Sequence, residues 1–113
     1  MPKVVHTRLL FWARGMAVFP WLILIHPSRR GDEALLAHER KHCEQMQRIG
    51  WPRFWWQYAI DPGFRLEMEL EAYRVTLQHR PHALEDIART LASEYHLDLS
   101  VEEARDLLRK PAT

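Results

Sequence analysis

The stretch over residues 31–50 reads GDEALLAHERKHCEQMQRIG, and we expect the rest of the fold to be arranged around it. Its apolar residues recur every three or four positions, as they do along one face of a helix. These residues are Leu35, Leu36, Cys43, Met46 and Ile49. Asp32 suits the positive end of a helix dipole, and Gly50 is a typical stop. The pattern therefore predicts one helix over residues 31–50.

This helix carries an HExxH motif, which begins at His38 and ends at His42. Side chains four positions apart project from the same helix face, so both imidazoles can occupy corners of one tetrahedral zinc site. Glu39 is rotated away by one residue, and it can instead reach a water molecule on the ion as a general base. The motif thus predicts a Zn²⁺ cofactor and hydrolysis by a metal-activated water.

Composition limits the other classes of function. The chain has 113 residues, of which 47% are hydrophobic and 27% charged, as in a single globular domain. A net charge of +1 gives no case for binding nucleic acid. The single cysteine, Cys43, excludes an internal disulfide and fits a reducing compartment. No secretory signal or membrane-spanning run is evident, so we expect a cytoplasmic protein without membrane contact.

The segment before the helix is rich in β-branched and aromatic residues. Val4–Trp12 and Met16–Ile25 predict two or three short strands, with Arg14–Gly15 as the turn between them. Pro20 predicts an edge strand or a break within the second run. A loop over 26–31 then leads into the HExxH helix.

The segment after Gly50 predicts three or four further helices. The first is an aromatic helix over 51–60, with Pro52 in its first turn and a ring-bearing face that we expect to pack in the core. That face comprises Trp51, Trp55 and Tyr58. The next helices are predicted over 64–79 and from Pro81 to about Tyr95. A capping box at Ser100–Glu103 begins the last, which ends near Arg109.

The expected architecture is therefore an α+β fold, with a small N-terminal sheet packed on the HExxH helix. We expect one domain over residues 1–113, because no linker divides the chain. Its parts are strands and loop in 1–30, the active-site helix in 31–50, the aromatic segment and a glutamate-bearing helix in 51–79, and C-terminal helices in 80–113.

A catalytic zinc site usually has a third protein ligand. The metzincin pattern HExxHxxGxxH fails here, because Gln45 and Arg48 occupy its last two fixed positions. The peptide deformylase pattern needs a separate cysteine, whereas the only cysteine directly follows His42. Glutamates of the 64–79 helix remain, and the candidates are Glu67, Glu69 and Glu71.

Residues 69–73 read ELEAY and match an ExxAY motif. An HExxH helix followed by such a motif resembles the gluzincin metallopeptidases, in particular the very small members called minigluzincins. The likeness covers residues 14–79. It implies a zincin-like fold, in which an edge strand beside the HExxH helix can bind an extended substrate by strand addition.

The resemblance also implies roles for individual residues. His38, His42 and Glu69 would be the zinc ligands, with Glu39 as the base; Glu71 and then Glu67 are the alternatives to Glu69. Tyr73 stands where larger gluzincins place an aspartate that hydrogen-bonds a ligand histidine. Larger members also have a His or Tyr that stabilises the oxyanion. The candidates for that role are Tyr58, Tyr73, His79, His82 and Tyr95.

The expected activity is zinc-dependent hydrolysis of a peptide or protein substrate. We expect the C-terminal helices to pack over the metal and keep the isolated chain inactive, with His79, His82 or a C-terminal residue in the fourth coordination position. The alternative is a non-catalytic module, in which zinc joins two helices and the Trp-rich surface binds a partner. A third alternative is a membrane-surface protein that uses Trp12, Trp21 and the run over 16–25.

Overall fold

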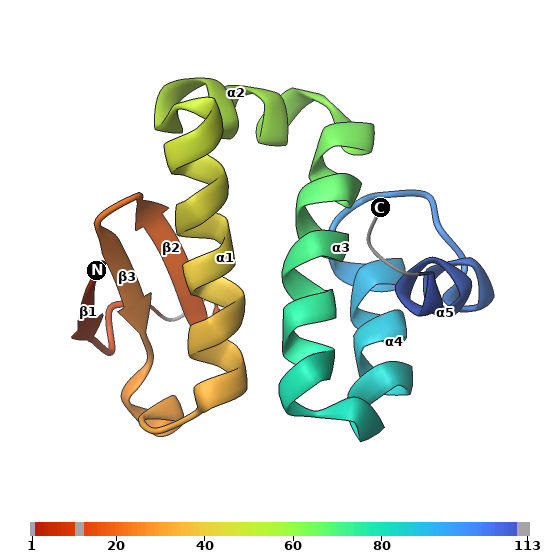
Figure 1. The fold of residues 1–113 in the computed structure, drawn as a ribbon, viewed down its shortest axis with the longest axis horizontal. Helices are drawn as coiled ribbons and strands as arrows, with labels where there is room; N and C mark the ends of the chain where they lie inside the picture. The colour runs from red at the N-terminus through yellow and green to blue at the C-terminus, as the bar shows by residue number, and fades with distance from the viewer. Residues whose placement is uncertain (1, 11–12, 111–113) are drawn as a thin grey trace.

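The computed structural model describes residues 2–10 and 13–110, which form a three-stranded sheet followed by five α-helices. This confirms the expected α+β class. Figure 1 shows the sheet against α1, α1 beside α3, and α4 and α5 on the far side of α3. The elements are β1 (Lys3–His6), β2 (Gly15–Phe19), β3 (Leu22–Ile25), α1 (Glu33–Ile49), α2 (Trp51–Ile60), α3 (Pro62–His79), α4 (Leu84–Glu94) and α5 (Val101–Arg109).

The sheet has the strand order β1-β3-β2, in which β3 is parallel to β1 and antiparallel to β2. The β2–β3 turn lies at Pro20–Trp21, so the break predicted at Pro20 is confirmed. The turn predicted at Arg14–Gly15 is wrong, because Gly15 begins β2 and the Arg14 carbonyl accepts a hydrogen bond from the His26 amide at 2.8 Å. Phe11 and Trp12, the end of the first predicted run, lie outside the described residues.

Helix α1 begins and ends where the sequence predicts. The Asp32 side chain caps it by accepting a hydrogen bond from the Leu35 amide at 3.0 Å. At the other end Gly50 has φ +97°, a conformation that a side chain would strain. Together these caps satisfy backbone groups at both ends of the helix that carries the HExxH motif.

Helix α2 joins α1 to α3 and covers one end of the α1–sheet core (Figure 1). Its most deeply buried ring is Phe54, at 1% exposure. Trp55 is half-buried and donates a hydrogen bond from Nε1 to the Val18 carbonyl at 2.9 Å. Trp51 and Trp56 are 40% and 66% exposed. The expected core role therefore belongs mainly to Phe54 rather than to Trp51.

Helix α3 separates two hydrophobic clusters. Met68 packs with the sheet, α1 and α2, whereas Leu70 packs with α4 and α5. Glu69 lies between these two residues in the sequence and is itself buried. The α5 helix begins with the predicted capping box, formed by Ser100 and Glu103. Among the described residues, no helix is both long and apolar enough to cross a membrane.

Candidate metal centre

Three buried side chains converge between α1 and α3. Nε2 of His38 lies 3.2 Å from Nε2 of His42. The Glu69 carboxylate places Oε1 3.3 Å from His38 Nε2 and Oε2 3.2 Å from His42 Nε2. All three residues are at most 7% exposed. The structure thus brings together the three groups that the sequence predicts as metal ligands.

The other two glutamates of α3 are directed elsewhere. Glu71 lies 3.7 Å from the side-chain nitrogens of both Lys41 and Arg48. Glu67 is exposed to solvent. Of the three candidates, only Glu69 reaches the two histidines, and it does so because it projects from α3 towards α1.

The separations among the three residues suit one small cation. Zinc–nitrogen bonds of about 2.0–2.1 Å in a tetrahedral site place neighbouring ligand atoms about 3.3 Å apart. The 3.2 Å between the two Nε2 atoms agrees with that edge length. The two imidazoles contact different oxygens of Glu69, and the three ligand atoms lie within 4.8 Å of one another. The two helices therefore hold the three groups close enough together to converge on one ion.

A hydrogen bond fixes which nitrogen of His42 carries its proton. Nδ1 of His42 lies 2.8 Å from Oε1 of Gln45. The Gln45 amide nitrogen donates to the Met68 carbonyl at 3.1 Å and to Glu71 at 3.3 Å, so its oxygen is left as the acceptor. Neutral His42 is therefore protonated on Nδ1, and its Nε2 lone pair points towards Glu69 and His38.

The same reasoning applies to His38. Its Nδ1 lies 3.3 Å from Oγ1 of Thr76. The Thr76 hydroxyl donates its only proton to the Ala72 carbonyl at 3.4 Å, so Oγ1 accepts from the imidazole. This leaves a second Nε2 lone pair directed into the cluster.

The centre therefore needs a cation. Two imidazole lone pairs and a carboxylate face one another, and Oε1 of Glu69 is buried without a hydrogen-bond donor among the described residues. In the metal-free chain a proton meets this need. Burial alone would lower the pKa of His42, but the charge of Glu69 and its hydrogen bond raise that pKa to about 9. Burial would raise the pKa of Glu69, but His42 and His38 lower it well below its usual range.

Tyr58 supports Glu69 from α2. Its hydroxyl donates to Oε2 of Glu69 at 2.5 Å. Burial and the adjacent Glu69 charge raise the pKa of Tyr58 far above its usual range, which keeps this hydroxyl a donor. Because Tyr58 holds Oε2, the other oxygen of Glu69 is the one left without a donor.

Glu39, the predicted base, lies beneath the edge strand. Its Oε1 accepts a hydrogen bond from the Ala17 amide at 3.1 Å. The absence of a side chain at Gly15 allows this close approach, because a Cβ there would lie 3.4 Å from Cγ of Glu39 and 3.0 Å from Cδ1 of Ile25. The carboxylate is thus positioned by strand β2 rather than by the metal ligands.

Tyr73 adjoins the centre in a different way from the one expected. Its ring packs against His38 with centroids 4.3 Å apart, but its hydroxyl shares a hydrogen bond with Tyr95 at 2.7 Å. Thr76 makes the hydrogen bond to His38 that Tyr73 was expected to make. In this structure the Tyr73 hydroxyl therefore binds Tyr95 and not a ligand histidine, although its ring lies at the site.

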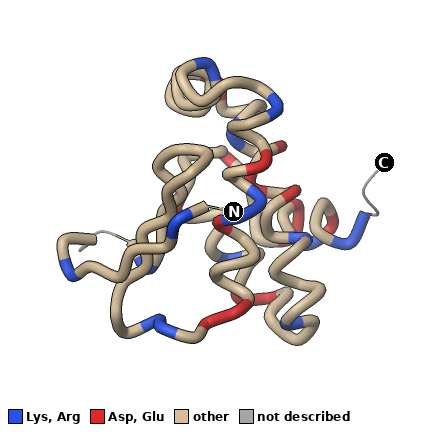
Figure 2. Tube along the Cα trace, turned by 60° about the vertical axis from the view of Figure 1, so that its left-hand side comes forward, with Lys and Arg blue, Asp and Glu red and all other residues tan. Residues whose placement is uncertain are grey.

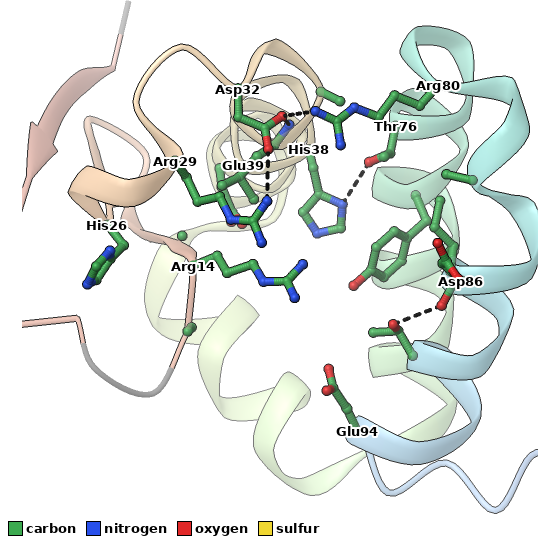
Figure 3. A pocket seen from close by; sticks show the side chains of 18 of the residues that line it. Arg14, His26, Arg29, Asp32, His38, Glu39, Thr76, Arg80, Asp86 and Glu94 are labelled. Carbon is green, nitrogen blue, oxygen red and sulfur yellow. Dashed lines mark hydrogen bonds and ion pairs between the residues drawn. The ribbon is translucent and has the colours of Figure 1, made fainter.

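A cavity of about 650 Å³ opens beside the HExxH motif and includes Tyr73 and Tyr95 in its wall. Figure 3 shows His38 and Glu39 on one side of it. His79 and His82 are both exposed, and neither belongs to the cluster of ligand atoms among the described residues. The expectation that one of these two histidines fills the fourth coordination position is not supported.

Comparison of the chain with protein-family models, with curated proteins and with solved structures found no match in any of the three.

Sequence reasoning did not assign the groups that orient the ligands. Gln45 follows His42 by three residues and Thr76 follows Glu69 by seven, spacings that place each on the ligand face of its own helix. These spacings could have identified both residues. No local pattern shows that Tyr58 reaches Glu69, because that contact depends on the angle between α2 and α3.

Proposed function

We propose that this chain is a zinc-dependent peptidase with a zincin-like arrangement of the gluzincin type. The observation that carries the proposal is the convergence of Nε2 of His38, Nε2 of His42 and the Glu69 carboxylate, which offer one ligand atom each within 4.8 Å of one another. The order of strand, HExxH helix and glutamate helix also supports it, because it is the order that the resemblance implies.

The residues present fit Zn²⁺. Two imidazoles and one carboxylate are the ligand set of many catalytic zinc sites. Oε1 of Glu69, buried without a donor, gains a partner when a cation binds. When bound, zinc would supply a Lewis acid that makes a water molecule more acidic and polarises the substrate carbonyl. The three ligands would hold it, and the contacts of Gln45 and Thr76 with Nδ1 would keep the Nε2 lone pairs directed at it.

Glu39 would act on protons. As general base its carboxylate accepts a proton from the attacking water, and as general acid it returns that proton to the leaving amine. The Ala17 amide fixes Oε1 at 3.1 Å, so the carboxylate cannot rotate freely away from the centre. An extended peptide would lie along the outer edge of β2, whose Ala17 amide faces Glu39.

The number of ligands favours catalysis over a purely structural zinc site. Structural zinc sites usually have four protein ligands, whereas catalytic sites have three and leave a position for water. Within the part of the chain that the structure describes, the cluster contains three ligands and adjoins a cavity. The zinc-joined interaction module therefore has less support, although Trp51 and Trp56 are exposed.

The test is the substitution Glu39→Gln in the zinc-loaded protein. We expect zinc content to be unchanged and the rate of peptide hydrolysis to fall about a hundred- to ten-thousandfold, because the general base is lost. Glu44→Gln is the matched control, since Glu44 is an exposed glutamate of the same helix. Cleavage of an unbiased peptide library by Glu39→Gln at the parent rate would refute the assigned base.

A further inference from the structure

The charged residues around the cavity beside the HExxH motif differ in how they are paired. Arg80 lies 3.1 Å and Arg29 3.9 Å from the carboxylate of Asp32, so both guanidinium groups have an ionic partner. Asp86 lies 3.5 Å from Arg89. Arg14 also lines the cavity, and it has no ion pair among the described residues.

Arg14 is held at a defined place relative to the reacting groups. Its carbonyl oxygen accepts a hydrogen bond from the His26 amide at 2.8 Å, which fixes its backbone against β3. It directly precedes β2, the strand whose Ala17 amide binds Glu39. Figure 3 shows its guanidinium extending into the cavity rather than away from it.

The distribution of acidic residues around Arg14 indicates which ligand its guanidinium can bind. Arg14 lies in the N-terminal segment 2–31, which contains no aspartate or glutamate. Figure 2 shows the acidic residues along the helices, away from the sheet. Two carboxylates without an ion pair among the described residues also line the cavity, Glu39 from α1 and Glu94 from the end of α4 on the opposite side (Figure 3). A planar guanidinium without an internal partner suits a carboxylate, which it can bind through two parallel hydrogen bonds.

We propose that Arg14 is a specificity-determining residue, which binds a carboxylate of the substrate in the cavity beside Glu39. This inference rests on the proposed peptidase function, because that function makes the bound peptide a substrate. The binding of a carboxylate by Arg14 can be measured without cleavage. The carboxylate can come from an acidic side chain or from the C-terminus of a peptide. Because Arg14 is exposed to solvent, screening limits the gain to about five- to tenfold in affinity.

The experiment measures peptide binding by calorimetry, in a zinc-loaded Glu39→Gln background that prevents cleavage. The probes are acetylated, amidated alanine hexapeptides with one glutamate or one glutamine at each position in turn, and the all-alanine peptide with a free C-terminal carboxylate. Preference for a glutamate position identifies a side-chain carboxylate, and preference for the free terminus identifies a terminal one.

We expect one of these carboxylates to improve binding about five- to tenfold, and Arg14→Gln to abolish that gain. Arg53→Gln is the matched control, because Arg53 binds Gln57 on α2 and does not line the cavity; it should keep the preference. Equal binding of all peptides, no measurable binding of any, or a preference that survives Arg14→Gln would each overturn the inference.

Zinc content and cleavage of an unbiased peptide library separate this inference from the proposed function. If zinc binds and the parent cleaves the library but no carboxylate preference depends on Arg14, only the inference fails. If the preference depends on Arg14 but no zinc binds and no peptide is cleaved, the proposed function fails and the binding site stands.

Discussion

Nδ1 of His42 lies 2.8 Å from Oε1 of Gln45, and this contact fixes which nitrogen of the neutral imidazole carries the proton. The Gln45 amide nitrogen is already engaged with the Met68 carbonyl on α3, so one glutamine links the orientation of a ligand on α1 to the position of the helix that carries Glu69. Thr76 constrains His38 from the same helix. The candidate metal centre is therefore shaped by α3 at each of the three proposed ligands.

The substitution Gln45→Leu should weaken zinc binding about ten- to a hundredfold, because it removes the acceptor that holds His42 in its metal-binding tautomer. The dissociation constant for zinc, measured by competition with a chromogenic chelator, checks this. Gln47→Leu is the control, since Gln47 is exposed on the same helix. Equal zinc affinities of the two variants would show that the Gln45 contact does not orient the ligand.

The substitution Thr76→Val should also lower zinc affinity, by about tenfold or more, because it deletes the acceptor for His38 Nδ1 while it keeps the shape of the side chain. Thr76→Ser keeps the hydroxyl and should bind zinc nearly as tightly as the parent. The same competition assay distinguishes the two variants. If Thr76→Ser bound zinc as weakly as Thr76→Val, the loss of zinc affinity would come from altered packing and not from the missing hydroxyl.

Zinc binding should release a proton below about pH 9. The pKa of His42 in the metal-free chain is raised from 6.5 to about 9 by Glu69, so its Nε2 carries a proton that the metal must displace. Zinc affinity should therefore rise with pH up to about 9 and then level off. Calorimetric titration in buffers of different ionisation enthalpy counts the protons, and a count of zero at pH 7.5 would contradict the assignment.

The folding stability of the metal-free chain should also depend on the protonation of His42, but it should fall as pH rises. A histidine whose pKa is raised on folding stabilises the fold fully below its unfolded pKa of 6.5, and this contribution is lost as pH rises through about 9. Thermal unfolding at pH 6.5 and 9.5 measures the loss. His42→Gln should remove this pH dependence of stability. If the stability of that variant still fell between pH 6.5 and 9.5, a group other than His42 would be responsible.

The substitution Gly15→Ala should destabilise the fold by about 1–3 kcal/mol, because the added Cβ would lie 3.0 Å from Cδ1 of Ile25 and crowd Glu39. We expect hydrolysis to fall more than zinc affinity, since Glu39 moves but the ligands do not. Gly63→Ala is the control, where the Cβ meets one side-chain atom at 3.3 Å, Oδ1 of Asp61, which caps α3. Chemical denaturation and zinc titration of both variants provide the measurement.

Local patterns predicted the helices well because their signals are local. Asp32 and Gly50 delimit α1, and the capping box at Ser100–Glu103 begins α5, as the sequence indicates. The three ligands could be predicted because helical spacing places His38 and His42 on one face and because the ExxAY resemblance selects Glu69 among three glutamates. The structure brings these three residues together. These features depend on a few neighbouring residues.

Features that depend on distant contacts were not predictable in the same way. The parallel pairing of β1 with β3 places Lys3 opposite Leu22, and nothing near either residue specifies that partner. The Tyr73 hydroxyl turns to Tyr95, which comes from the end of α4, while Thr76 takes the contact with His38. Such choices are decided by how whole helices pack, and a single sequence does not contain that information in a local form.

The most direct measurement of the central claim is the zinc content of the purified protein, with the His42→Ala and Glu69→Ala variants beside it and Glu71→Ala as the control. We predict one zinc per chain in the parent and in Glu71→Ala, and a loss of zinc in the other two, because Glu71 pairs with Lys41 and Arg48 rather than with the cluster. A parent without zinc after saturation and dialysis, or full zinc content in His42→Ala and Glu69→Ala, would contradict the assigned metal centre.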